Sequence, residues 1–171
     1  MKQLQDRVAM VTGASSGLGR AIAEMFAAEG AKVVLAARRK AVLDEVVAGI
    51  EKGGGTALAV AADVTKEADV AALFKAAKNK FGRVDILVNN AGMPNFKPTE
   101  EMSLADWQAI VDVNLTAVFL CSRRGTESDE AAGWRAHRQH GQHFGLVAAS
   151  ALDRLHGDEG GRRGTDALAD A

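Results

Sequence analysis

The first 90 residues alternate between short apolar runs and longer segments in which apolar residues recur every three or four positions. Four of the runs are apolar without interruption, which is typical of strands that are covered on both faces. These runs are Val8–Val11, Val33–Ala36, Leu58–Ala61 and Ile86–Val88. The alternation predicts βαβ units, and therefore an α/β fold with a parallel sheet.

The segments between the runs have the spacing of amphipathic helices, with apolar residues at i, i+3 and i+4. Each apolar stripe is expected to seat one helix on the sheet. The stripes are Ile22, Met25 and Phe26, then Leu43, Val46, Val47 and Ile50, then Val70, Leu73, Phe74 and Ala77. Gly30 and Gly53–Gly55 are expected to end two of these helices, because glycine readily adopts positive φ.

A fourth helix is predicted to begin near Ser103, where Ser-Leu-Ala-Asp resembles a capping box. Its apolar stripe consists of Trp107, Ile110, Val111, Leu115, Val118 and Phe119. Asn114 lies on the same stripe. A polar amide on an apolar face must find hydrogen-bond partners or it destabilises the fold by a few kcal/mol, so Asn114 is either a structural or a functional amide.

Composition limits the class of protein. The chain has 171 residues, 47% of them hydrophobic, and a net charge of -1, which indicates one soluble domain and disfavours nucleic acid as a partner. Residues 1–6 lack the apolar run of a signal peptide, and no run approaches the roughly 18 apolar residues of a membrane span. We therefore expect a cytoplasmic location and no membrane partner. The single cysteine, Cys121, excludes an internal disulfide.

The first predicted strand ends in a glycine-rich turn directly before a helix. The turn reads Thr12-Gly13-Ala14-Ser15-Ser16-Gly17-Leu18-Gly19. Glycines let the backbone approach a pyrophosphate, and the free N–H groups of the helix N-terminus stabilise its charge. Taken alone the turn is weak support for nucleotide binding, because a tight strand-to-helix connection favours glycine in any case.

At this point the chain resembles the short-chain dehydrogenase/reductase family, whose pattern Thr-Gly-x-x-x-Gly-x-Gly is met by the turn. Asp63-Val64 resembles the family's adenine-contacting pair, Asn89-Asn90-Ala91-Gly92 resembles its Asn-Asn-Ala-Gly signature, and Asn114 resembles the helix asparagine of its catalytic tetrad. The matches occur in the family's order and cover residues 6–123. Taken singly, Asp63 could be a turn or capping residue, and Asn89-Asn90 with Gly92 could merely end a strand.

The resemblance implies a Rossmann-type doubly wound sheet and hydride transfer between a nicotinamide cofactor and a small alcohol or carbonyl substrate. It implies that Asn114 helps to hold a water-linked proton relay, that no metal takes part, and that the whole enzyme is usually homo-oligomeric. The expected cofactor-binding residues are Gly13, Ser15, Ser16, Gly17, Leu18, Gly19, Arg38, Arg39, Asp63, Val64, Asn90, Ala91 and Gly92. An S-adenosylmethionine methyltransferase fits worse, because its nucleotide has no pyrophosphate.

The end of the second strand bears on the choice of cofactor. A carboxylate about 20 residues past the glycine turn would bind the ribose 2′-hydroxyl of NAD, whereas an arginine accommodates the 2′-phosphate of NADP. The expected acidic position is Ala37, and Arg38 and Arg39 follow it. The sequence therefore favours NADP(H). The alternative is that both arginines are solvated surface charges, which leaves NAD(H) open.

The resemblance stops near Arg124. It implies that a serine, a tyrosine and a lysine follow Asn114 for proton transfer, yet the chain has no tyrosine and its last lysine is Lys97. Catalysis is therefore expected to be impaired. His137, His140 and His143 lack a carboxylate partner and are interpreted as a polar run rather than a metal site.

The genetic code offers an account of the last 48 residues. Back-translated and read one nucleotide later from Arg124, one degenerate solution begins EALKVMK, continues through GGRIVNTGSIS, and reaches YMATKAAVAGLTR. Tyrosine then falls at the Leu155 codon, lysine at the Glu159 codon, and serine thirteen positions before the tyrosine. That string resembles the family's fifth strand and its catalytic serine, tyrosine and lysine. We interpret residues 124–171 as an out-of-frame translation.

Two domains of unequal character are therefore expected. Residues 1–123 would form an NADP(H)-binding half with strand order 3-2-1-4, and residues 124–171 a non-family tail that is disordered or partly helical, with a helix near Ala148–Leu155. Without a fifth strand, Ile86–Val88 would be a bare apolar edge, which predicts poor solubility. The resemblance implies that the helices of the family's oligomer contacts lie largely beyond the break, so the usual oligomer is not expected to be preserved. The competing interpretation of the chain is a non-catalytic dinucleotide-binding remnant or a non-functional product.

Overall fold

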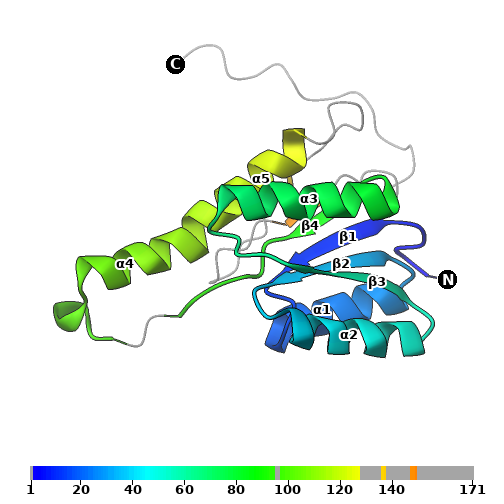
Figure 1. Ribbon diagram of the computed structural model, residues 1–171, viewed down its shortest axis with the longest axis horizontal. Coiled ribbons are helices and arrows are strands. Elements are labelled where there is room, and N and C mark those ends of the chain that lie inside the picture. The colour runs from blue at the N-terminus through cyan, green and yellow to red at the C-terminus, as the bar shows by residue number, and fades with distance from the viewer. Residues whose placement is uncertain (1, 95–96, 128–135, 138–146, 150–171) are drawn as a thin grey trace, which may run out of the picture.

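The computed structural model describes residues 2–94, 97–127, 136–137 and 147–149. Within them a parallel sheet lies between two layers of helices (Figure 1). The four predicted strands and the first three predicted helices are all present. Their bounds are β1 Val8–Thr12, α1 Gly17–Ala28, β2 Lys32–Ala37, α2 Lys40–Lys52, β3 Thr56–Ala61, α3 Glu67–Phe81 and β4 Ile86–Val88.

The strand order places β1 at the centre of the parallel part of the sheet. The order runs β3-β2-β1-β4, and β1 pairs in parallel with β2 on one side and with β4 on the other. The chain therefore moves away from β1 in one direction through β2 and β3, then crosses over to β4. Such a switch point opens a crevice at the carboxyl ends of the strands, where α/β proteins bind ligands. The predicted Rossmann-type fold is confirmed.

Each face of the sheet has its own core, as covered parallel strands require. Figure 1 shows α1 and α2 on one face and α3 with α5 (Ala117–Glu127) on the other. On the first face one detail of the sequence prediction is wrong. Met25 of α1 is 56% exposed, and the helix is instead buried through Gly19, Ala23 and Ala27. Small side chains let the helix approach the sheet closely, so the larger residue turns outward.

The outer edge of β4 is covered, which contradicts the predicted bare edge. A short strand from the tail, β6 (Val147–Ala149), pairs antiparallel with β4, and β5 (Ala136–His137) pairs antiparallel with β6. The prediction failed because the apolar residues Ala148 and Ala149 were assigned to a helix, whereas an edge offers backbone N–H and C=O groups to any extended segment. The helix predicted from Ala148 is wrong at its first two residues, and its remainder lies outside the described residues.

The fourth predicted helix belongs to a longer one. It begins as α4 (Leu104–Val111), passes through the π-helical segment η2 (Asp112–Thr116) and continues as α5 beyond Arg124. A single 3-10 turn, η1 (Thr99–Glu101), precedes it. The capping box is confirmed, because Asp106 N donates to Ser103 Oγ at 3.1 Å and Ser103 N donates to Asp106 Oδ2 at 3.1 Å.

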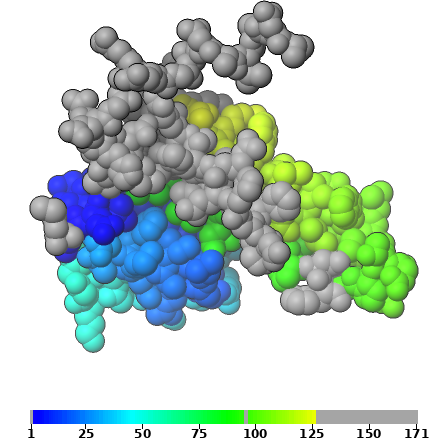
Figure 2. Space-filling model, turned by 180° about the vertical axis from the view of Figure 1, so that it is seen from behind, coloured from blue at the N-terminus to red at the C-terminus, as the bar shows by residue number. Residues whose placement is uncertain are grey.

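This long helix leaves much of its apolar stripe uncovered by the described residues. None of the residues of α4 is buried, and α4 projects beyond the sheet in both views (Figures 1 and 2). Trp107, Leu115 and Phe119 are exposed. By length and composition, residues 104–126 could cross a membrane, contrary to the expectation from unbroken apolar runs, although the core helix of a soluble protein can pass the same test.

The reactivity of Cys121 can be used to test whether α5 packs against the sheet and α3. Its side chain is fully buried, and burial raises the pKa of its thiol to about 12. Because the thiolate is the reactive form, we expect iodoacetamide at pH 8 to leave the native protein unmodified and to alkylate it fully in guanidinium chloride. Mass spectrometry of the intact chain measures this directly. Rapid modification without denaturant would show that α5 is not docked.

Candidate functional site

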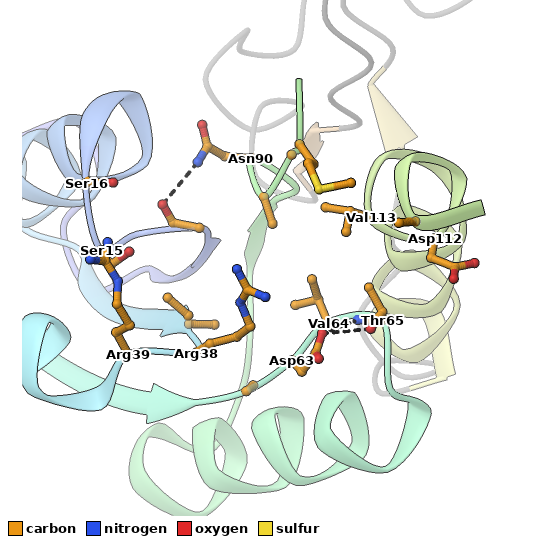
Figure 3. Close-up of a pocket in the computed structure, with 18 of the residues that line it drawn as sticks. Ser15, Ser16, Arg38, Arg39, Asp63, Val64, Thr65, Asn90, Asp112 and Val113 are labelled. Atoms are coloured by element: carbon orange, nitrogen blue, oxygen red, sulfur yellow. Dashed lines mark hydrogen bonds between the residues drawn. The ribbon is translucent and has the colours of Figure 1, made fainter. Parts of the chain in front are cut away.

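A cleft of about 940 Å³ lies across the carboxyl ends of the parallel strands. Its size is within the range of small-molecule sites. Its walls come from the turn after β1, the ends of β2 and β3, the segment after β4 and the junction of α4 with η2 (Figure 3). Ten of the predicted cofactor residues line it: Gly13, Ser15, Ser16, Arg38, Arg39, Asp63, Val64, Asn90, Ala91 and Gly92.

Four other predicted residues are not part of the cleft wall but lie next to it in the chain or support it. Gly17, Leu18 and Gly19 begin α1 directly after Ser16, and Asn114 lies in η2 beside Val113. Leu18 is 71% exposed. The sequence therefore identified the segments that form the cleft.

The glycine turn is shaped by close backbone contacts. A Cβ at Gly19 would lie 2.3 Å from Asn90 Nδ2 and 2.5 Å from the carbonyl oxygen of Gly13, so the position excludes any side chain. Gly17 has φ of +56°, and a Cβ there would meet nothing within 4 Å. One glycine thus allows the turn to pack on the segment after β4, and the other faces open space at the start of α1.

The N-terminus of α1 suits an anion. Ser16 is the N-cap residue, and its side chain makes no capping hydrogen bond with the first turn. The first N–H groups of the helix carry partial positive charge and point out of its end. A dinucleotide pyrophosphate placed here would meet backbone donors, an open glycine surface and no acidic side chain in the first turn of α1. The residues present therefore fit a bound dinucleotide.

A buried threonine joins the glycine turn to the segment after β4. The hydroxyl of Thr12 donates to the Val88 carbonyl at 3.3 Å and accepts from the backbone N–H groups of Asn90 and Ala91, each at 3.0 Å. The side-chain amide of Asn90 donates back to the Thr12 carbonyl at 3.0 Å. These bonds explain why threonine precedes the first glycine, since a hydroxyl can donate and accept at once.

The wall at the end of β2 is basic. Arg38 and Arg39 are exposed and line the cleft, as does Ser15 of the glycine turn (Figure 3). Asp63 also lines the cleft, and its carboxylate accepts hydrogen bonds from Thr65. These bonds lower the pKa of Asp63, and the charges of Lys66 and Arg38 lower it further. The wall thus combines two cations with a carboxylate that stays ionised.

Asn114 holds the far wall of the cleft to the long helix. Its Oδ1 accepts from the Met93 backbone N–H at 2.9 Å, and its Nδ2 donates to the Met93 carbonyl at 2.8 Å. The amide therefore finds the partners that its place on an apolar stripe requires. It lies in η2, and π-helical turns are frequent at functional sites because they interrupt the regular backbone pattern.

Sequence reasoning assigned no cofactor role to several residues that line the cleft. They are Ala36, Ala37, Ala62, Thr65, Met93, Pro94, Ala109, Asp112 and Val113. Asp112 and Val113 directly precede Asn114, so the spacing of the long helix could have found them. Met93 and Pro94 directly follow Gly92 of the Asn-Asn-Ala-Gly motif, and the adjoining Asn95-Phe96 lies outside the described residues.

Comparisons with known proteins agree with this geometry. The family model for short chain dehydrogenase matches residues 7–133. The chain is 48% identical to a 3-oxoacyl-[acyl-carrier-protein] reductase of Synechocystis over 72% of this chain and 50% of the relative. It is 47% identical to 3beta-hydroxysteroid dehydrogenase 1 of Eggerthella lenta over 72% of this chain and 48% of the relative.

A solved structure gives the same result. A short-chain type dehydrogenase/reductase from Mycobacterium marinum superposes with a TM-score of 0.71 at 35% sequence identity, over 73% of this chain and 51% of that one. The chain therefore spans about half the length of the curated relatives that it matches. The residues matched by the family model, 7–133, include all those that line the cleft.

Proposed function

The chain belongs to the short-chain dehydrogenase family, and from that premise we propose that residues 1–123 bind NADP(H) for hydride transfer to or from an alcohol or carbonyl carbon. The observation that carries the proposal is the cleft, which combines the open glycine turn with the basic wall at Arg38 and Arg39. The cofactor supplies the hydride when it is bound. The chain's own residues would hold its pyrophosphate at the start of α1 and its adenine at Asp63-Val64.

The preference for the phosphorylated cofactor rests on charge. The position that would carry a ribose-binding carboxylate is Ala37, so no negative charge there opposes a 2′-phosphate. The guanidinium groups of Arg38 and Arg39 can each donate several hydrogen bonds to phosphate oxygens, and Ser15 adds a hydroxyl. NAD(H) would use the same turn but would gain nothing from the two cations.

We also propose that the chain as written is catalytically impaired. Of the four positions that the family uses for proton transfer, it supplies only Asn114, which would keep Met93 and the adjoining wall in place. The other three would come from the alternative reading frame after Arg124. The competing function is a non-catalytic dinucleotide-binding remnant. Both functions assume that the cofactor-binding domain ends at residue 123 and that residues 124–171 form a separate tail.

The first experiment separates cofactor binding from turnover. Purified chain is titrated with NADPH and NADH by calorimetry, then incubated with NADPH and a carbonyl panel that includes a 3-oxoacyl thioester and a 3-oxosteroid, after the names of the two relatives. We expect NADPH to bind more tightly than NADH and no carbonyl-dependent oxidation. Absence of NADPH binding would refute the cofactor assignment, and turnover would refute the impairment.

Substrate, partners and location are proposed at the level of the family. A small alcohol or carbonyl compound is the substrate class, the cytoplasm is the location, and neither nucleic acid nor a membrane is a partner. The whole enzymes of this family are typically oligomeric. We propose that this chain does not keep the usual oligomer, because the segment after Arg124, where the family's contact helices would lie, is interpreted as out of frame.

A further inference from the structure

The loop after β3 is held by hydrogen bonds within it and by bonds to the neighbouring elements β2 and α3. Asp63 is the residue on which most of its bonds converge. Its carbonyl accepts from Lys66 N at 2.9 Å, which closes a tight turn. Its Oδ1 accepts from the Thr65 backbone N–H at 3.2 Å and from the Thr65 hydroxyl at 2.7 Å. The remaining backbone group of Asp63 is its N–H.

That N–H donates to Asp69. The distance from Asp63 N to Asp69 Oδ2 is 2.9 Å, and the Asp69 side chain is half-buried in the first turn of α3. The bond ties the cleft-lining loop to the helix that follows it. A hydrogen bond to an ionised carboxylate is shorter and stronger than one between neutral groups. Asp69 itself does not line the cleft.

We propose that Asp69 is a positioning residue for the adenine half of the cofactor and that it acts through the main chain of Asp63. The inference rests on the proposed function, which gives Asp63-Val64 to the adenine. With Asp69 in place the loop has one conformation before the ligand arrives. Without it, the Asp63 N–H at the base of the loop loses its partner, and binding must then order the loop at a cost in affinity.

The neighbouring carboxylate Glu67 gives a matched control. It lies in the same first turn of α3, but its side chain is exposed and binds Arg123 of α5 rather than the loop. Glu67→Gln and Asp69→Asn each remove one negative charge from the helix N-terminus. Asp69→Asn keeps an oxygen that can accept from Asp63 N, whereas Asp69→Leu removes the acceptor.

The test measures binding of adenosine 2′,5′-bisphosphate to the full chain by calorimetry. Loss of a hydrogen bond to a charged group weakens binding by about tenfold, so we expect that loss for Asp69→Leu. Asp69→Asn should recover most of the affinity, and Glu67→Gln should leave it unchanged.

The outcomes distinguish a failure of the proposed cofactor binding from a failure of the proposed role of Asp69. If the wild-type chain does not bind the bisphosphate, the proposed function and this inference both fail. If it binds and Asp69→Leu binds equally well, only the inference fails. Should Asp69→Leu not fold, amide hydrogen exchange of the wild type remains: a protected Asp63 N–H supports the bond, and exchange at the rate of an exposed amide overturns it.

Discussion

Deleting one nucleotide at the start of the Arg124 codon is expected to turn this chain into an active oxidoreductase. The shifted frame supplies a tyrosine at the Leu155 codon and a lysine at the Glu159 codon, provided that the native codons permit them. A positioned acid–base group is worth about 10²–10⁴ in rate, so carbonyl-dependent NADPH oxidation should rise by at least about a hundredfold. The measurement is the loss of NADPH absorbance with the carbonyl panel described above.

A substitution at the restored tyrosine provides the control for this experiment. Phenylalanine in place of the restored tyrosine removes only the hydroxyl, so it should abolish the gained activity and leave NADPH binding intact. Sequencing the coding DNA comes first. A codon at Leu155 that cannot give TAC, or one at Glu159 that cannot give AAG, in the shifted frame would refute the interpretation before any assay.

The frame interpretation also fits the topology at β4. A doubly wound sheet continues with a parallel strand beside β4, which requires a crossover helix between the two strands. In this chain the strand beside β4 is antiparallel and pairs over three residues. The helix that would make the crossover, the continuous run from α4 to α5, is present. That helix lies within residues 7–133, which the family model matches.

Much of the fold could be predicted because the spacing of apolar residues along the chain indicates which faces of the strands and helices are buried. Each strand from β1 to β4 contains an uninterrupted apolar run, and the stripes of α2 and α3 bury Leu43, Val46, Val70 and Leu73 as expected. The edge of β4 could not be predicted in that way. Pairing with β6 uses backbone groups, which every residue carries, so the apolar pattern of Val147–Ala149 does not specify which strand it pairs with.

In the candidate site, residues that belong to a motif could be predicted and residues without one could not. Residues with a motif, such as Gly13 and Asp63, could be found because their chemistry requires a particular residue type. Asp69 could not be found, because a carboxylate in the first turn of a helix is common and favourable without any ligand. Only the 2.9 Å contact with Asp63 N distinguishes it. Asp112 could have been found from its position two residues before Asn114, but no motif marks it.

Replacing Arg38 with alanine is expected to change cofactor discrimination more than any other single substitution in the cleft wall. Arg38 is exposed at the end of β2, lines the cleft, and is close enough to Asp63 to affect its pKa. A charge-assisted bond to a phosphate contributes about 1.5–3 kcal/mol, so Arg38→Ala should weaken NADPH binding by roughly ten- to a hundredfold. NADH lacks the 2′-phosphate and should lose no more than about twofold by the same reasoning.

Arg20 offers a control with the same change of charge. It is exposed on α1, pairs with Glu24 at 2.8 Å and does not line the cleft, so Arg20→Ala should leave the affinity for both cofactors unchanged. Calorimetry at two salt concentrations adds a further check, because a bond to the 2′-phosphate should make the discrimination salt-dependent. Equal losses for NADPH and NADH with Arg38→Ala would mean that Arg38 does not contact the 2′-phosphate. The two arginines would then be solvated charges, and the basis for preferring NADP(H) would be lost.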